Sequence, residues 1–219
     1  LPDALVNFLA LLGWSLDGET TIIPPAELCR TFSLDRITKK HSIFDEKKLD
    51  WMNAEYINAM SNADFADQIM LPELLKAGLI KEGFEADAAW LGALAEIVRP
   101  RTKMPADAAT VAAPVFATAE TLAYDEKSVS KGLAKEGMGA VLDAAKAALE
   151  ALDEWTPANI DAALEPLPEV LDVKKRLVFG AVRVAECGNM VSPPLGETMA
   201  LIGRDDCLAR IDRARPMAL

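Results

Sequence analysis

The chain has 219 residues, of which 51% are hydrophobic and 26% charged, and its formal net charge is −11. This length and composition suit a folded chain with one large core or two to three small ones, and they exclude a disordered protein. No apolar run reaches the roughly 18 residues that a membrane span needs, and the apolar stretch at residues 5–12 lacks the preceding basic region of a signal peptide. We therefore expect a soluble cytoplasmic protein with no membrane role.

Helical spacing of apolar residues recurs along the chain and predicts an all-α fold. The predicted helices cover residues 2–12, 25–32, 46–60, 64–79, 84–98, 139–152, 173–187, 194–202 and 206–213, and another begins where Thr156 caps a helix with Pro157 in its first position. Pro100, Pro105 and Pro114 are expected to break up any long element between residues 99 and 138. The best candidates for domain boundaries lie near Ser61 and Tyr124.

The basic residues are unevenly distributed. Of the 23 lysines and arginines, 17 fall in four windows, at residues 30–51, 99–103, 173–185 and 204–215, so the rest of the chain is strongly acidic. A nonspecific nucleic-acid binder is usually basic throughout, because phosphate neutralisation supplies most of its affinity. The pattern favours one polyanionic partner of defined shape, touched at a few places. Chance clustering on solvated helix faces is the alternative that composition leaves open.

Residues for catalysis are hard to find. The single histidine, His41, lies in a polar loop where a solvated side chain is the usual outcome. No nucleophile elbow, phosphate-binding loop, dinucleotide fingerprint or metal-ligand spacing occurs, so we predict no catalytic residue and no metal site. Cys29, Cys187 and Cys207 lack CxxC spacing and are interpreted as reduced thiols in a core. A free-standing enzyme would need an unmarked pair of carboxylates.

The first basic window predicts a helix that starts near Asp45. On that helix Leu49, Met52 and Tyr56 face one way, while Lys48 and Trp51 lie side by side on the adjacent stripe. A cation beside an indole can hold a phosphate and pack on a ribose or a base. The alternative is a core tryptophan flanked by a surface lysine.

The stretch FDEKKLDWMNAEYI at residues 44–57, together with LPDALVNFLALLGWS at residues 1–15, closely resembles bacterial glutamyl-tRNA synthetases just after their catalytic nucleotide-binding domain. The resemblance extends, with weaker stretches, over essentially all 219 residues. It implies the tRNA-binding part of a ligase that attaches glutamate to tRNA(Glu) in the cytoplasm, with a catalytic domain, which binds ATP and Mg, preceding Leu1. This chain alone is expected to be non-catalytic, to need no cofactor and to be a monomer.

The same resemblance implies a domain division. Residues 1–61 would form a stem-contact region, to which Lys48 and Trp51 belong. Residues 62–123 and 124–219 would form two helical subdomains that together make an anticodon-binding cage.

The second basic window matches the Arg-Pro-Arg segment of this family. Pro100 is expected to end the preceding helix and to splay the two neighbouring guanidinium groups outward. The resemblance implies that Arg101 reads the third anticodon base, and the planar fork of an arginine suits a base edge. Arg99 is predicted to contact phosphate. From the residues alone, a surface salt bridge remains the alternative.

In the third window, Lys174 and Arg176 are predicted to contact phosphate. Arg176, Gly180 and Arg183 share one helix face, where the glycine would leave room for a chain to approach the backbone. Arg183 matches the arginine of the family's Gln-Pro-Leu-Arg stretch and is assigned to the anticodon by resemblance. Gly180 and Ala181 depart from that stretch, which puts the contact of the family's glutamine in doubt.

Ser192 and Pro193 match the family's Ser/Thr-Pro turn next to the anticodon. We expect Ser192 to cap the helix that follows, so that its hydroxyl and the free N–H groups offer a polar edge to an unstacked base. An ordinary capped helix start is the alternative. The fourth window alternates in charge and is interpreted as a solvated helix face without contacts.

A rival interpretation comes from another class of protein. The strong acidity and helical content also suit an all-helical protein-interaction module with no role in nucleic-acid binding.

Overall fold

The computed structural model describes residues 1–38 and 43–219, so the predicted loop position of His41 lies outside the described residues. The described residues form helices joined by turns, with no strand among them, which confirms the predicted all-α fold. Within these two ranges, no helix combines the length and the apolar character that a membrane crossing requires.

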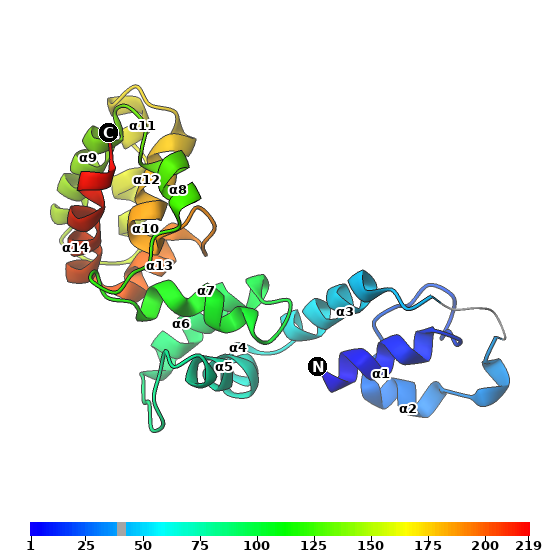
Figure 1. Cartoon of the computed structure of the whole chain (residues 1–219). Helices are drawn as coiled ribbons and strands as arrows, with labels where there is room; N and C mark the ends of the chain where they lie inside the picture. The colour runs from blue at the N-terminus through cyan, green and yellow to red at the C-terminus, as the bar shows by residue number, and fades with distance from the viewer. Residues whose placement is uncertain (39–42) are drawn as a thin grey trace.

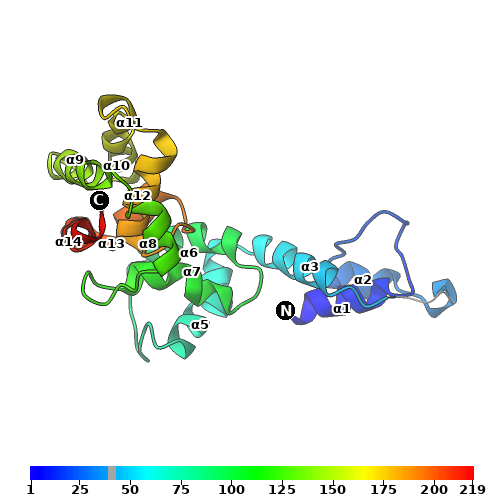
Figure 2. The same cartoon turned by 45° about the horizontal axis from the view of Figure 1, so that its top comes forward.

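The helices are arranged as an elongated molecule with three parts (Figures 1 and 2). An arm (residues 1–58) lies at one end, a middle unit (residues 62–116) follows it, and an end unit (residues 126–217) lies at the other end. Hydrophobic clusters of buried side chains occur in each part. The predicted boundaries near Ser61 and Tyr124 fall close to the connections between these parts, but the predicted domain division itself stays an interpretation.

The arm contains α1 (Pro2–Leu11), α2 (Pro25–Thr31), the 3-10 turn η1 (Leu34–Arg36) and α3 (Glu46–Asn58). Its small core is built on Trp14, Ile23 and Leu28. As predicted, α3 begins after Asp45, whose side chain accepts a hydrogen bond from the Lys48 N–H group at 3.1 Å. The apolar face of α3 turns inward, with Met52 fully buried, and the helix leads from α1 to the middle unit (Figure 1).

The middle unit contains α4 (Asn62–Phe65), a π-helical turn η2 (Ala66–Met70), α5 (Leu71–Lys76), α6 (Ala88–Val98), the 3-10 turn η3 (Arg99–Arg101) and α7 (Asp107–Phe116). The π turn directly precedes Leu71 and Pro72. Pro72 has no N–H group to donate to the carbonyl four residues back, so the regular α-helical pattern is interrupted here. Leu74, Leu94 and Val98 are fully buried in the shared core.

The end unit contains α8 (Glu126–Gly132), α9 (Met138–Glu150), α10 (Pro157–Leu164), α11 (Leu167–Val170), α12 (Lys175–Cys187), α13 (Leu195–Ile202), α14 (Arg204–Ala214) and the 3-10 turn η4 (Arg215–Met217). The predicted cap of α10 is confirmed, because the Thr156 hydroxyl accepts from the Asn159 N–H group at 3.3 Å. Helix α12 lies inside the unit, with Val178, Ala181 and Val184 fully buried.

Three α-helices were not predicted, namely α7, α8 and the four-residue α11. Pro114 was expected to interrupt the chain, yet it lies inside α7, and α8 has only seven residues. Because Pro114 has no N–H group, the Thr110 carbonyl loses its helical donor. Thr110 is exposed, so water can take the place of that single hydrogen bond and α7 tolerates the proline.

The cysteines are free, and Cys187 and Cys207 are buried as expected. Cys29 is exposed, so its predicted place in a core is wrong. It lies on a short amphipathic helix, α2, whose buried residue is the neighbouring Leu28.

Candidate nucleic-acid interface

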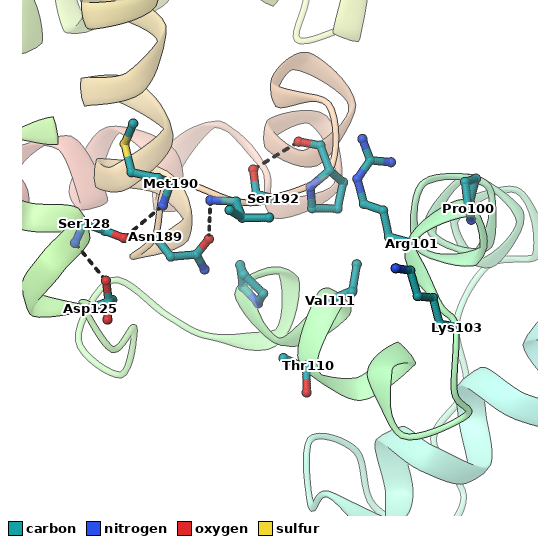
Figure 3. Close-up of a pocket in the computed structure, with 13 residues that line it drawn as sticks. Pro100, Arg101, Lys103, Thr110, Val111, Asp125, Ser128, Asn189, Met190 and Ser192 are labelled. Carbon is teal, nitrogen blue, oxygen red and sulfur yellow. Dashed lines mark hydrogen bonds between the residues drawn. The ribbon is translucent and has the colours of Figure 1, made fainter. Parts of the chain in front are cut away.

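A groove of about 700 Å³ lies between the middle unit and the end unit. Its lining comes from η3 and the turn after it, from α7, from the start of α8, and from the loop between α12 and α13 (Figure 3). The lining residues are Pro100, Arg101, Lys103, Thr110, Val111, Pro114, Asp125, Ser128, Asn189, Met190, Val191, Ser192 and Pro193. Residues that are about 90 positions apart in the sequence therefore share one cavity.

Arg101 and Arg99 flank Pro100 but point to different surroundings. α6 ends at Val98, and Arg101 is exposed and extends toward the loop that carries Ser192 (Figure 3). Its Nη1 donates only a long hydrogen bond, 3.3 Å, to the Ile97 carbonyl. This arrangement keeps most of its guanidinium donors available to a ligand in the groove.

Arg99 turns back toward the arm. Its Nε donates to Asn62 Oδ1 at 3.2 Å, and its Nη1 donates to the carbonyl oxygen of Asn58 at the end of α3. The expectation that both arginines splay outward is therefore wrong for Arg99, because two acceptors of α3 and α4 lie within its reach. Its contact with phosphate stays a prediction. The guanidinium that would make this contact already joins η3 to the arm.

Arg183 supports the loop on the opposite wall. Its Nη1 donates to the carbonyl oxygens of Ser192 and Pro193, at 3.2 and 2.7 Å, and also to the Ser192 hydroxyl. Arg183 is half-buried in this position. The structure thus brings three of the predicted anticodon residues together, with Arg183 holding the segment that presents the other two.

The predicted cap at Ser192 is wrong. α13 begins at Leu195, with Pro194 as its N-cap residue and no side-chain capping bond. The Ser192 hydroxyl instead donates to the Pro193 carbonyl at 3.0 Å. Two successive prolines hold the chain extended, so the helix starts later than the Ser-Pro pair suggested.

The loop that carries Ser192 is anchored to α8. The Gly188 carbonyl accepts from the Asp125 N–H group at 2.8 Å, and the Met190 N–H group donates to Ser128 Oγ at 3.2 Å. Val191, at the tip of the loop, is 86% exposed. The loop therefore presents an apolar tip on a fixed base.

The face of α12 around Gly180 is covered by the protein itself. A Cβ on Gly180 would lie 3.3 Å from Met190 Cε, and the Gly180 carbonyl lies 3.4 Å from the position of a Cβ on Gly132 in α8. The expected room for a bound chain between Arg176 and Arg183 is thus filled. Gly180 serves the close packing of α12 against the loop and α8.

The groove is charged at both ends. Arg101 and Lys103, both exposed, stand at one end, and Asp125 stands at the other. Hydrogen bonds from the side chain and backbone of Ser128 hold the pKa of Asp125 below its ordinary value. The groove can thus pair anionic groups at one end and hydrogen-bond donors at the other.

A second cavity of about 600 Å³ shares Pro100 and Arg101 with the groove. Trp90, Glu96 and Glu197 also line it. Arg101 accordingly stands on the ridge between two cavities, and the second one offers two carboxylates as acceptors.

The other predicted contact residues lie away from the groove. Lys48 and Trp51 are exposed on α3, with 46% of Trp51 accessible, so the alternative of a core tryptophan is wrong. Lys174 and Arg176 are exposed at the start of α12. Across the described ranges, no three His, Cys, Asp or Glu side chains are grouped as a metal site would require.

The interpretation of the fourth window as a solvated helix face is wrong. Arg210 of α14 is fully buried, and Arg213 of the same helix donates to the Leu122 carbonyl at 2.8 Å. Alternating charges predicted exposure, but both arginines reach carbonyl groups of the connection between the middle and end units. Only the neighbouring element reveals those partners.

Several lining residues carried no signal in the sequence. Thr110, Val111 and Pro114 belong to α7 and Ser128 belongs to α8, and neither helix was predicted. Lys103 could have been found, because it lies in the second basic window.

Residues 43–215 match a protein family described as "Anticodon binding domain". The chain is 40% identical over 219 residues to a glutamate–tRNA ligase of Corynebacterium diphtheriae, covering 98% of this chain and 43% of that protein. It is 36% identical to a glutamate–tRNA ligase of Moorella thermoacetica, with the same two coverages. The chain thus spans less than half the length of these relatives.

The fold is also similar to a solved structure. A glutamate tRNA ligase from Elizabethkingia meningosepticum, determined in complex with its amino acid, superposes with a TM-score of 0.84 at 22% identity, covering 99% of this chain and 41% of that one. The family match includes α3, both helical units and the residues of the groove. The chain therefore belongs to the anticodon-binding domain family, in the form that glutamate–tRNA ligases carry.

Proposed function

We propose that this chain is the tRNA-binding, anticodon-recognising portion of a glutamate–tRNA ligase, and that it holds unpaired anticodon bases of tRNA(Glu) in the groove. The observation that carries the proposal is the meeting of Arg101 with the Ser192–Pro193 segment across one cavity in a member of the anticodon-binding family. The whole ligase would attach glutamate to the tRNA with ATP and Mg, bound in a part that this chain does not span. The chain by itself would catalyse neither the activation of glutamate with ATP nor its transfer to the tRNA.

The charges of the groove suggest how a base is held. Arg101 offers a planar fork of donors to a base edge or a phosphate, and Lys103 adds a second cation beside it. Val191 and Pro193 give apolar surface for the flat face of an unstacked base, and Asp125 can accept from an exocyclic amino group. We assign Arg101 to the third anticodon base, and Ser192, Pro193 and the loop-holding Arg183 to the same recognition.

The remaining predicted residues would contact the body of the tRNA. Lys48 and Trp51 on the arm suit the stem, with a cation and an indole exposed on one helix. Arg99, Lys174 and Arg176 are proposed as phosphate contacts. We further propose that the protein is a cytoplasmic monomer with tRNA(Glu) as its partner.

Binding of labelled tRNA(Glu) tests the proposal. We expect retention that weakens with salt along a straight log–log line, because phosphate contacts release counterions. Arg101→Ala should reduce the preference for tRNA(Glu) over a tRNA changed only at the third anticodon base by about tenfold, since one good base contact contributes roughly 1 to 3 kcal/mol.

Arg204→Ala is the matched control, because this arginine donates to the Glu150 carbonyl within the end unit and lines neither cavity. It should leave the preference unchanged. Equal losses for both tRNAs in Arg101→Ala would refute the assignment to that base. No retention of tRNA at any salt concentration would instead support the protein-interaction module.

A further inference from the structure

Arg210 joins the two walls of the groove from behind. Its side chain is fully buried, and its Nη1 donates to the Glu186 carbonyl at 2.6 Å and to the Pro114 carbonyl at 2.9 Å. Its Nη2 donates to the Ala117 carbonyl at 2.5 Å. One guanidinium therefore binds backbone from the end unit, from the middle unit and from the connection between them.

The carbonyls that Arg210 binds lie at helix ends. Pro114 is in the last turn of α7, and Glu186 is in the last turn of α12. The last carbonyls of a helix have no partner within it and carry partial negative charge, so a cation is favourable there. Arg210 thus neutralises the carboxyl ends of two helices, one from each unit.

Asp206 completes the contact. Its Oδ2 accepts from Arg210 Nε at 2.7 Å, and its Oδ1 accepts from the Ala119 N–H group at 2.8 Å. A buried cation is tolerated only when it is paired and hydrogen-bonded, and here both conditions are met. The connection after α7 is therefore tied to α14 by a donor and an acceptor.

Pro114 links this contact to the groove, because it also lines the cavity. Its place fixes how far α7 stands from the loop of residues 189–193 on the opposite wall. α13 packs against α6 and α7 as well, so the two units would remain joined without Arg210 but would be held less rigidly.

We propose that Arg210 is a positioning residue that sets the width of the groove, and through it the discrimination between anticodon bases. The second half of this inference rests on the proposed function. Arg210 itself touches no base, since it is buried behind the cavity lining.

The test uses Arg210→Lys, which keeps the charge beside Asp206. A single ammonium group cannot reach three carbonyls in the directions of a guanidinium fork, so the carbonyl contacts are lost while the ion pair persists. Arg215→Lys is the matched control. Arg215 follows the same helix, and its guanidinium pairs with Asp143 at 2.7 Å inside the end unit.

The first measurement needs no RNA. Spin labels on cysteines introduced at Thr110 and Val191, both exposed on opposite walls, report the groove width in a Cys29→Ser background, since the other two cysteines are buried. We expect a broader and longer distance distribution in Arg210→Lys and an unchanged one in Arg215→Lys. An unchanged distribution in Arg210→Lys would overturn the proposal.

The second measurement compares unlabelled variants for binding to tRNA(Glu) and to the tRNA changed at the third anticodon base. Arg210→Lys should lower the ratio of the two affinities several-fold, whereas a role confined to stability would leave the ratio unchanged among folded molecules. If the wild-type chain binds no tRNA, the proposed function fails while the label distances still decide the groove width. If Arg210→Lys does not fold, Asp206→Asn takes its place, because it keeps an acceptor for Ala119 but removes the charge that holds the guanidinium on the three carbonyls. The same broader distance distribution is expected, and an unchanged one would overturn the proposal.

Discussion

Glu186 is a buried carboxylic acid without access to water. It lies fully buried on α12, and neither of its carboxyl oxygens has a hydrogen-bond partner. The nearby cation, Arg210, is already paired with Asp206. Burial raises the pKa of Glu186 to about 8, so the carboxyl group is mostly protonated at neutral pH.

This pKa predicts how stability depends on pH. The folded value lies above the ordinary 4.5, so the protonated carboxyl contributes stability that is complete below 4.5 and is lost as pH rises through about 8. We expect Glu186→Gln to be more stable than wild type at pH 8.5, by on the order of 3 to 5 kcal/mol, and to equal it near pH 4.

Denaturant unfolding at several pH values measures this difference. Comparing the two proteins cancels the contributions of all other groups, which both proteins share. Parallel curves for wild type and Glu186→Gln would show that the carboxyl group is ionised in the folded protein.

At the scale of elements, the sequence predicts a helix well where apolar residues repeat at helical spacing and a capping residue precedes them. Asp45 and Thr156 begin helices as predicted, because an N-cap bond lies within four residues of sequence. The resemblance assigns both Arg101 and Arg183 to the anticodon. Only the structure shows that Arg183 donates to the Ser192 and Pro193 carbonyls and so supports the loop. α7 was not predicted because it contains Pro114, and α8 was not predicted because it is short. The stability of both helices comes from packing, which the local sequence does not show.

The end of α12 gives a prediction at this scale. Gly188 has φ +72°, and a Cβ there would lie 2.0 Å from the Ala123 carbonyl oxygen. Gly137 has φ +85° with nothing within 4 Å of such a Cβ. Gly137→Ala should therefore cost about 1 kcal/mol, for backbone strain alone, and Gly188→Ala clearly more, because the loop must also move.

Thermal unfolding of both variants separates strain from collision. Because the Gly188 carbonyl helps to anchor the groove loop to Asp125, tRNA binding should weaken in Gly188→Ala and not in Gly137→Ala. Equal losses of stability in the two variants would contradict a steric clash between the new Cβ at residue 188 and the Ala123 carbonyl.

At the scale of the whole molecule, the arm and the groove are mechanically connected. Arg99 joins η3 to Asn58 and Asn62, and Asn53 of α3 donates to the Lys103 carbonyl at 2.5 Å. The turn that presents Arg101 is thus held by the helix that carries Lys48 and Trp51. A tRNA bound to the arm would meet a groove whose position is already fixed.

Two substitutions on the arm test this division of contacts. Lys48→Ala with Trp51→Ala should weaken binding of whole tRNA(Glu) several-fold, because a phosphate contact and a stacking surface are removed. Binding of an isolated anticodon stem-loop should stay the same, since that fragment cannot reach α3. Filter binding with both RNAs measures the effect, and an equal loss for the stem-loop would place these residues near the groove instead.

The tie between α14 and the connection after α7 also bears on the order in which the chain folds. Arg210 and Pro114 are 96 positions apart, and Arg213 and Leu122 are 91 apart. A growing chain that has left the ribosome as far as α13 has made both walls, but the Pro114 and Ala117 carbonyls at the end of α7 still lack the guanidinium of Arg210. The contacts that tie the two units together behind the groove therefore form late in synthesis, only after α14 has emerged.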